Sequence, residues 1–348
     1  MKKSISAGIL YIILFLCLAL CFSGCSSDGP NTSGKKILCA DFSEYDWTRN
    51  ILGDNPGNIG LDLLCTTGVD MHSFQPSAAD FVKMSNCSLF VYAGGISEYW
   101  IDEAFKSSHD NSQNKIVCLM DVFCSNDALS KRYQFECQEH EHEHEDEDTH
   151  QHKHEHEDGD ADEHEHDHEH EVDEHLWLSL KMAPVFCNEI CTAVCELDPE
   201  NSQYYKNQTK EYVKELEDLD YQFDRITKKS NNKSLLFADR FPFHYMEEDY
   251  NLTCYAAFPG CSAETEASFD TIISLSDKMK SENLNSIIIL KNSKVNLANV
   301  IINASQKKNS KILVMDSIQS VTEDEIKNGY TFTGAMKNNL NTLTLALE

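Results

Sequence analysis

The sequence predicts an α/β fold in which two lobes, each built on a parallel sheet, are joined by a long rigid helix. Three observations indicate this fold. Short apolar runs alternate with helical stretches from Lys35 onward, the same alternation starts again after residue 230, and one long helical stretch separates the two. Alternating strands and helices are typical of parallel sheets. Because such sheets bind ligands beyond the carboxyl ends of their strands, we expect a binding cleft between the lobes.

The first lobe is expected to cover residues 35–197. Its strand candidates are short apolar segments bounded by glycine or polar residues, and the helical stretch WTRNILGD follows the first of them. Their alternation with helical segments predicts one largely parallel sheet. The candidates are KKILCADF (35–42), the segment that begins LDLLC and runs into a loop at Gly68, CSLFVYAGG (87–95) and KIVCLMDV (115–122).

Residues 198–230 are predicted to form the helix that links the lobes. No Gly or Pro follows Pro199 in this stretch, and its apolar side chains recur at mixed three- and four-residue spacing. This spacing places them on one face of a helix. They are Tyr205, Tyr212, Val213, Leu216, Leu219 and Phe223.

The second lobe is expected to cover residues 231–348. Three apolar runs have the length of buried strands, and helical stretches lie between them. A final helix is predicted over residues 334–347. This repeated pattern predicts a second parallel sheet. The three runs are SLLFAD (234–239), SIIILK (286–291) and KILVMD (311–316).

The amino terminus predicts export and membrane anchoring. Lys2 and Lys3 precede an apolar run, residues 9–22, that is shorter than a membrane-spanning helix. Residues 1–24 therefore have the pattern of a signal peptide, with an uncleaved signal anchor as the alternative. Cys25, directly after Ser-Gly, resembles the cysteine that receives a lipid in bacterial lipoproteins. The polar residues 25–34 predict a lipidated, flexible tether.

The charge distribution excludes a nucleic-acid partner. The formal net charge is −29, whereas phosphate backbones are bound by basic surfaces. Residues 136–174 contain 20 acidic side chains and one lysine, and so contribute −19 of this charge. Outside residues 138–171, the sequence has no nucleophile–base pair, phosphate-binding loop or HExxH motif, so we expect a binding protein that is not an enzyme.

Residues 138–171 form a segment in which histidines mostly alternate with Glu or Asp. A segment this polar cannot bury a core, so we expect it to be disordered. Imidazole is a common ligand of zinc, copper and nickel, and nearby carboxylates raise the local cation concentration. We therefore predict a loop that collects metal ions, with an ordinary solvated charge run as the alternative. Its histidines are His140, His142, His144, His150, His152, His154, His156, His164, His166, His168 and His170.

Two further histidines have a different setting. His72 lies on a loop after a strand-like segment, and His175 lies where the acidic segment ends and apolar sequence begins. Taken alone, a loop histidine is more often a surface residue than a metal ligand, so composition and position leave both readings open.

Five ordered segments carry a family resemblance. GVDMHSFQPSAAD contains His72 and DEHLWLSL contains His175; the others are CSLFVYAGGISEYW, FADRFPFHYMEEDYNL with AAFPGCSAETEAS, and KILVMDSI. In order and spacing they resemble the substrate-binding lipoproteins of bacterial zinc and manganese ABC importers, the ZnuA/TroA-like periplasmic metal-binding family. In that family, a loop rich in His and acid before the second histidine is a hallmark of zinc-selective members.

The resemblance implies one metal ion in the interlobe cleft, with His72, His175 and Asp316 at ligand positions. Two imidazoles and one carboxylate leave a fourth tetrahedral position on zinc. The alternative for Asp316 is a helix N-cap. The remaining family position departs from the pattern: alignment on the aromatic residues puts Ala238 there, alignment on the strand end puts Asp239 there, and His244 is a further candidate. More imidazole favours zinc and more carboxylate favours manganese.

By this resemblance the protein captures Zn²⁺ outside the cytoplasm and delivers it to an ABC permease and its ATPase. We expect a monomer anchored by lipid to the bacterial cell membrane, on the periplasmic side where there are two membranes. Two alternatives remain: a manganese or iron protein of the same fold, which the His-rich segment argues against, and a surface metal buffer or adhesin with no transport role.

Overall fold

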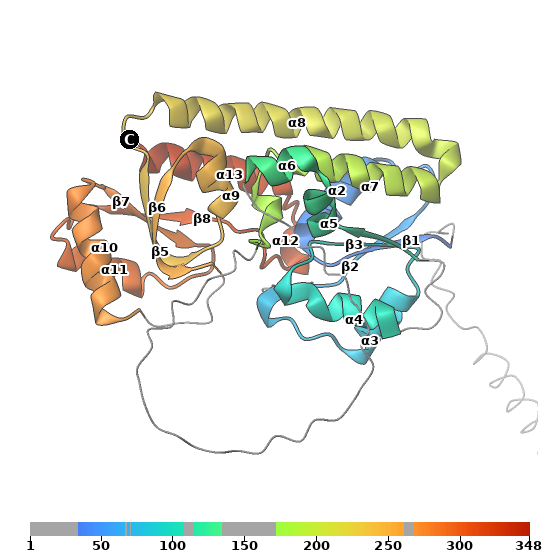
Figure 1. Cartoon of the computed structure of the whole chain (residues 1–348), viewed down its shortest axis with the longest axis horizontal. Helices are drawn as coiled ribbons and strands as arrows, with labels where there is room; N and C mark the ends of the chain where they lie inside the picture. Colours follow the sequence, from blue (N-terminus) through green and yellow to red (C-terminus); the bar gives the residue numbers. More distant parts are fainter. Residues whose placement is uncertain (1–33, 67, 70, 108–113, 134–171, 261–266) are drawn as a thin grey trace, which may run out of the picture.

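The computed structural model describes residues 34–66, 68–69, 71–107, 114–133, 172–260 and 267–348. Within these residues the chain forms two four-stranded sheets, ordered β2-β1-β3-β4 and β6-β5-β7-β8 (Figure 1). All pairings between these strands are parallel. The two-lobed parallel α/β fold predicted from the sequence is therefore confirmed.

The strands are short and most helices lie between consecutive strands. The strands are β1 (Lys36–Cys39), β2 (Gly60–Leu63), β3 (Leu89–Tyr92), β4 (Lys115–Cys118), β5 (Ser234–Phe241), β6 (Thr253–Pro259), β7 (Ser286–Leu290) and β8 (Lys311–Met315). The α-helices are α2 (Phe42–Leu52), α3 (Ala78–Ser85), α4 (Tyr99–Ser107), α5 (Leu119–Ser125), α6 (Asp127–Arg132), α7 (Ala183–Leu197), α8 (Ser202–Lys229), α9 (His244–Tyr250), α10 (Phe269–Ser281), α11 (Asn296–Ala304), α12 (Glu323–Lys327) and α13 (Phe332–Ala346).

The first sheet is buried on both faces. Ile37 and Cys39 of β1 point into a core shared with α2 and α7, whereas Leu38 belongs to a separate core on the opposite face, where α3 and α4 lie (Figure 1). Side chains of a strand alternate between faces, so a strand covered on both sides is apolar throughout. This accounts for the continuous apolar runs in the sequence.

The long helix α8 runs along both lobes (Figure 1). Its 28 residues correspond to about 42 Å of helix. It contacts α2 and α7 of the first lobe and α9 and α13 of the second. Its buried face carries Tyr205, Thr209, Tyr212, Leu216, Leu219, Phe223 and Thr227, which includes five of the six apolar positions predicted from spacing.

Two elements differ from the sequence expectation. The segment 115–122 is a strand only as far as Cys118, and α5 begins at Leu119. The edge strand β6 was not expected; it pairs with β5 across a register shift between Phe237 and Arg240. In the described part of the chain, no helix combines the length and apolar character needed to cross a membrane.

Candidate metal centre

His72 and His175 meet although 103 residues separate them in the sequence. His72 lies in the 3-10 turn η1 (Met71–Ser73), shortly after β2, and His175 directly precedes the 3-10 turn η4 (Leu176–Leu178). Their Nε2 atoms are 3.4 Å apart. Two nitrogens that each lie about 2.0–2.1 Å from one tetrahedral zinc ion are about 3.3–3.4 Å apart, so this pair fits a shared zinc ion.

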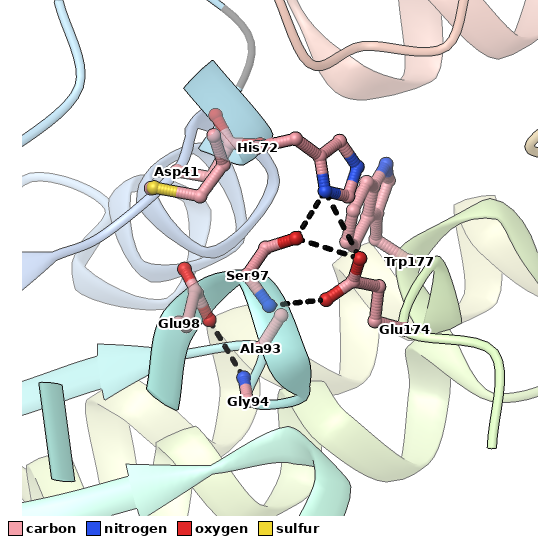
Figure 2. A pocket seen from close by; sticks show the side chains of 9 residues that line it. Asp41, His72, Ala93, Gly94, Ser97, Glu98, Glu174 and Trp177 are labelled. Carbon is pink, nitrogen blue, oxygen red and sulfur yellow. Dashed lines mark hydrogen bonds and ion pairs between the residues drawn. The ribbon is translucent and has the colours of Figure 1, made fainter. Parts of the chain in front are cut away.

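Both rings are oriented through Nδ1 by carboxylates. Nδ1 of His175 donates to Asp173 Oδ1 at 2.8 Å. Nδ1 of His72 lies 3.0 Å from Glu174 Oε1 and also contacts Ser97 Oγ (Figure 2). A carboxylate on Nδ1 fixes the tautomer that presents Nε2 as the metal-binding nitrogen. The turn that carries His175 thus supplies the orienting group for each imidazole.

Glu174 is held in place by the first lobe. Ser97 donates to it from its backbone nitrogen at 3.0 Å and from its hydroxyl at 2.8 Å. Burial raises the pKa of Glu174, but hydrogen bonds from His72 and Ser97 and the charge of His72 bring it down to about 2. At Gly95, where φ is +97°, a Cβ atom would lie 2.7 Å from Glu174 Cβ, so glycine permits this approach.

A small pocket beside His72 is lined by residues that follow β1 and β3 as well as by the two turns (Figure 2). Asp41 and Glu98 are buried acids in its wall. Glu98 accepts a hydrogen bond from the backbone nitrogen of Gly94 at 2.6 Å, while burial raises its pKa well above the usual value. The pocket thus lies beyond the carboxyl ends of parallel strands, as expected for a ligand site in this fold.

The loop after β8 brings the second lobe to the histidines. Trp177, whose ring lies against that of His175 with centroids 5.2 Å apart, donates from Nε1 to the carbonyl of Ser317 at 3.0 Å. The side-chain nitrogen of Gln319 is 3.0 Å from Nε2 of His72. Sequence reasoning missed Gln319, because a lone glutamine in a polar loop carries no signal of metal binding.

Asp316 lies at the end of β8, as predicted, but its contacts are with other groups. Its carboxylate accepts from the Tyr330 hydroxyl at 2.6 Å and from the backbone nitrogen of Ile318 at 2.8 Å, and it lies 3.2 Å from Nζ of Lys291. None of these contacts is with His72 or His175, so the role of Asp316 as a ligand stays a prediction.

Asp239 and His244 are likewise engaged elsewhere. Asp239 accepts from the backbone nitrogens of Arg240 at 2.9 Å and of Leu290 at 3.0 Å, which ties β5 to β7. His244 Nε2 lies 3.3 Å from Glu248 Oε1 on the same helix, α9. Among the residues that the structure describes, no group of three or more His, Cys, Asp or Glu side chains is arranged to hold a metal ion.

The other predicted site residues lie outside the described residues. These are the lipidation candidate Cys25 and the histidines of the acidic segment, His140, His142, His144, His150, His152, His154, His156, His164, His166, His168 and His170.

Comparison with known proteins supports a metal-binding role. The model of a family described as the periplasmic zinc-uptake complex component A, ZnuA, matches residues 40–346 of this chain. The high-affinity zinc uptake system protein ZnuA of Bacillus subtilis (strain 168) is 25% identical over 331 residues, which cover 94% of this chain and 93% of that protein.

Two further comparisons agree. The zinc-binding lipoprotein AdcA of Streptococcus pneumoniae (strain ATCC BAA-255 / R6) is 24% identical over 332 residues; the match covers 95% of this chain and 59% of AdcA, so this chain corresponds to part of that longer protein. The crystal structure of the metal-dependent lipoprotein YcdH of Bacillus subtilis has a TM-score of 0.68 at 22% identity, covering 90% of this chain and 99% of YcdH. The structural likeness concerns the fold.

Proposed function

This chain belongs to the ZnuA family of periplasmic zinc-uptake components, and on that premise we propose that it captures Zn²⁺ outside the cytoplasm and delivers it to an ABC permease and its ATPase. The family consists of transport components and is not an enzyme family. The chain would act by binding and releasing the ion.

The observation that carries the proposal is the pairing of His72 and His175. Their Nε2 atoms are separated by the distance expected for two ligands of one tetrahedral zinc ion, and each Nδ1 has a carboxylate partner. Imidazole ligands suit zinc better than manganese, which prefers carboxylates. Asp316, Asp239 and His244 remain candidates for further ligands.

The remaining parts have roles that follow from their chemistry. We infer that the His-rich segment 138–171 gathers Zn²⁺ from dilute surroundings and raises its concentration near the cleft. Cys25 would carry the lipid that keeps the protein, as a monomer, at the outer side of the cell membrane near its permease. Because the ligating imidazoles must be neutral, zinc affinity should fall at acid pH.

Zinc retained after dialysis against a weak chelator tests the proposal. The chain lacking residues 138–171 is compared with the same chain carrying His72→Ala and His175→Ala. We expect one zinc per chain, lost in the double variant. If manganese or iron is retained in place of zinc, the proposed site stands but the identity of its ion is different. If no metal is retained, binding belongs to the His-rich segment, and the proposed cleft site is wrong.

A further inference from the structure

The turn that follows β8 combines an anchored aspartate, a strained residue and a glutamine aimed at His72. Both the backbone and the side chain of Asp316 are held by hydrogen bonds or an ion pair. Its backbone nitrogen donates to Asn339 Oδ1 and its carbonyl accepts from Asn339 Nδ2, both at 2.8 Å. Its carboxylate, besides accepting from Tyr330, faces Lys291, whose Nζ also lies 2.7 Å from Glu325 and 4.3 Å from the Tyr330 ring centroid. Lys291 therefore already supplies Asp316 with a positive charge.

This anchoring holds an unusual backbone conformation. Ile318 has φ +64°, in the left-handed region, and its side chain is fully buried. A β-branched residue in this region is strained and keeps the conformation only where its surroundings impose it. The hydrogen bond from the Ile318 nitrogen to Asp316 Oδ1 is one such constraint. Strain of this kind gathers at functional sites, so the turn calls for a functional explanation.

The consequence of the turn is the position of Gln319. Its side chain is only 4% exposed, and its amide nitrogen lies 3.0 Å from His72 Nε2. Two donors on a tetrahedral zinc ion are about 3.3 Å apart, so the amide stands close to the place of a further ligand. The terminal torsion of a glutamine is broad and roughly two-fold. A half-turn about it exchanges the nitrogen for Oε1, which is a metal donor.

We propose that Gln319 supplies the second lobe's ligand to the ion through Oε1, beside Nε2 of His72 and of His175, and that Asp316 positions it by fixing the turn. This inference rests on the proposed function, because it concerns the same ion. A set of two imidazoles and a neutral amide carries no negative charge. The two imidazoles suit zinc, whereas a carboxylate in place of the amide would add a negative charge and suit manganese.

Zinc competition between the full chain and a chromophoric chelator tests this assignment. The His72→Ala/His175→Ala variant gives the baseline set by other sites. We expect Gln319→Ala and the similarly sized Gln319→Leu to weaken the cleft site by about 10–100-fold, at least the loss caused by removing an outer partner of a ligand. Gln319→Glu should retain zinc and bind Mn²⁺ about tenfold or more tightly than the parent chain.

Gln222→Ala, at an exposed hydrogen bond on α8, is the matched control and should leave zinc affinity unchanged. Thermal unfolding of each variant in the presence of chelator shows whether the variant is folded. If Gln319→Ala does not fold, Gln319→Leu and Gln319→Glu still test the assignment. Unchanged or tighter zinc binding in Gln319→Ala and Gln319→Leu, with the His72-dependent site intact, overturns the assignment and leaves the proposed function standing. Absence of any His72-dependent zinc in the parent chain overturns both.

Discussion

Glu44 lies in the first turn of α2 with its side chain completely buried. Burial raises its pKa from 4.5 to about 7. Between these two values the folded protein keeps a proton that the unfolded chain releases. The free energy of unfolding therefore falls as the pH rises from about 4.5 to about 7, and this contribution is constant above that range.

We expect Glu44→Gln to remove this dependence, which amounts to on the order of 2–3 kcal/mol between about pH 5 and pH 8. Urea unfolding at both pH values, in the presence of a chelator, measures it. Glu211→Gln, at an exposed position on α8, should keep the full difference. A Glu44→Gln variant that loses as much stability as the parent chain on going to the higher pH would contradict the prediction.

The sequence could identify individual site residues only where motif and chemistry agreed. His72 and His175 were found because their segments match a family pattern and imidazole is a metal ligand. Gln319 could not be identified from the sequence, because its position depends on the left-handed turn at Ile318 and on the hydrogen bonds between Asp316 and Asn339. These are tertiary contacts between β8 and α13 that no local pattern in the sequence contains.

At the level of elements, the strands that could be predicted from the sequence are those whose residues are buried on both faces of the sheet. Strands covered on both faces, such as β7 with its five buried residues, were evident as continuous apolar runs. The edge strand β6 was missed because three of its seven residues are only half-buried, and the adjacent Ala256 and Ala257 have weak strand propensity. The segment is a strand because it pairs with β5, and this tertiary contact cannot be deduced from the composition of the segment itself.

The helix α8 should be stabilised mainly by its buried face. Leu219 is fully buried in the large core, whereas Tyr221, two residues later, is 65% exposed. We expect Leu219→Ala to lower the free energy of unfolding by about 2–5 kcal/mol, because it loses buried apolar surface and leaves a cavity. Tyr221→Ala should change it by less than about 0.5 kcal/mol. Equal losses in urea unfolding would mean that α8 does not pack as described.

At the scale of the whole molecule, the two lobes share one hydrophobic core. Trp47 of α2 packs edge-on against Phe332 of α13 with ring centroids 5.2 Å apart, and the Phe332 nitrogen donates to Asp46 at 2.8 Å. Tyr133 of the first lobe donates to Asp249 of α9 at 2.7 Å. Large apolar interfaces restrain relative movement of domains, so we expect modest lobe movement when the ion binds.

A shared core also predicts that the lobes unfold together. The three tryptophans, at positions 47, 100 and 177, all belong to the first lobe, so their fluorescence reports on that lobe and, through Trp47 and Trp177, on its contacts with the second. Far-UV circular dichroism reports on the helices of both. In a two-state transition the two signals change together. If the lobes unfold together, a destabilising substitution in the second lobe should therefore also lower the unfolding midpoint measured by tryptophan fluorescence.

Ile287 of β7 is fully buried in the outer core of the second lobe, beneath α10 and α11 and separate from the shared core. We expect Ile287→Ala to destabilise the protein by about 2–5 kcal/mol and to lower the fluorescence and dichroism midpoints equally. Val300→Ala, at a position 47% exposed on α11, should leave both in place. If the dichroism transition splits while the tryptophan transition stays put, the lobes fold independently. The core between them would then be too weak to couple them, and the expectation of modest lobe movement would fail with it.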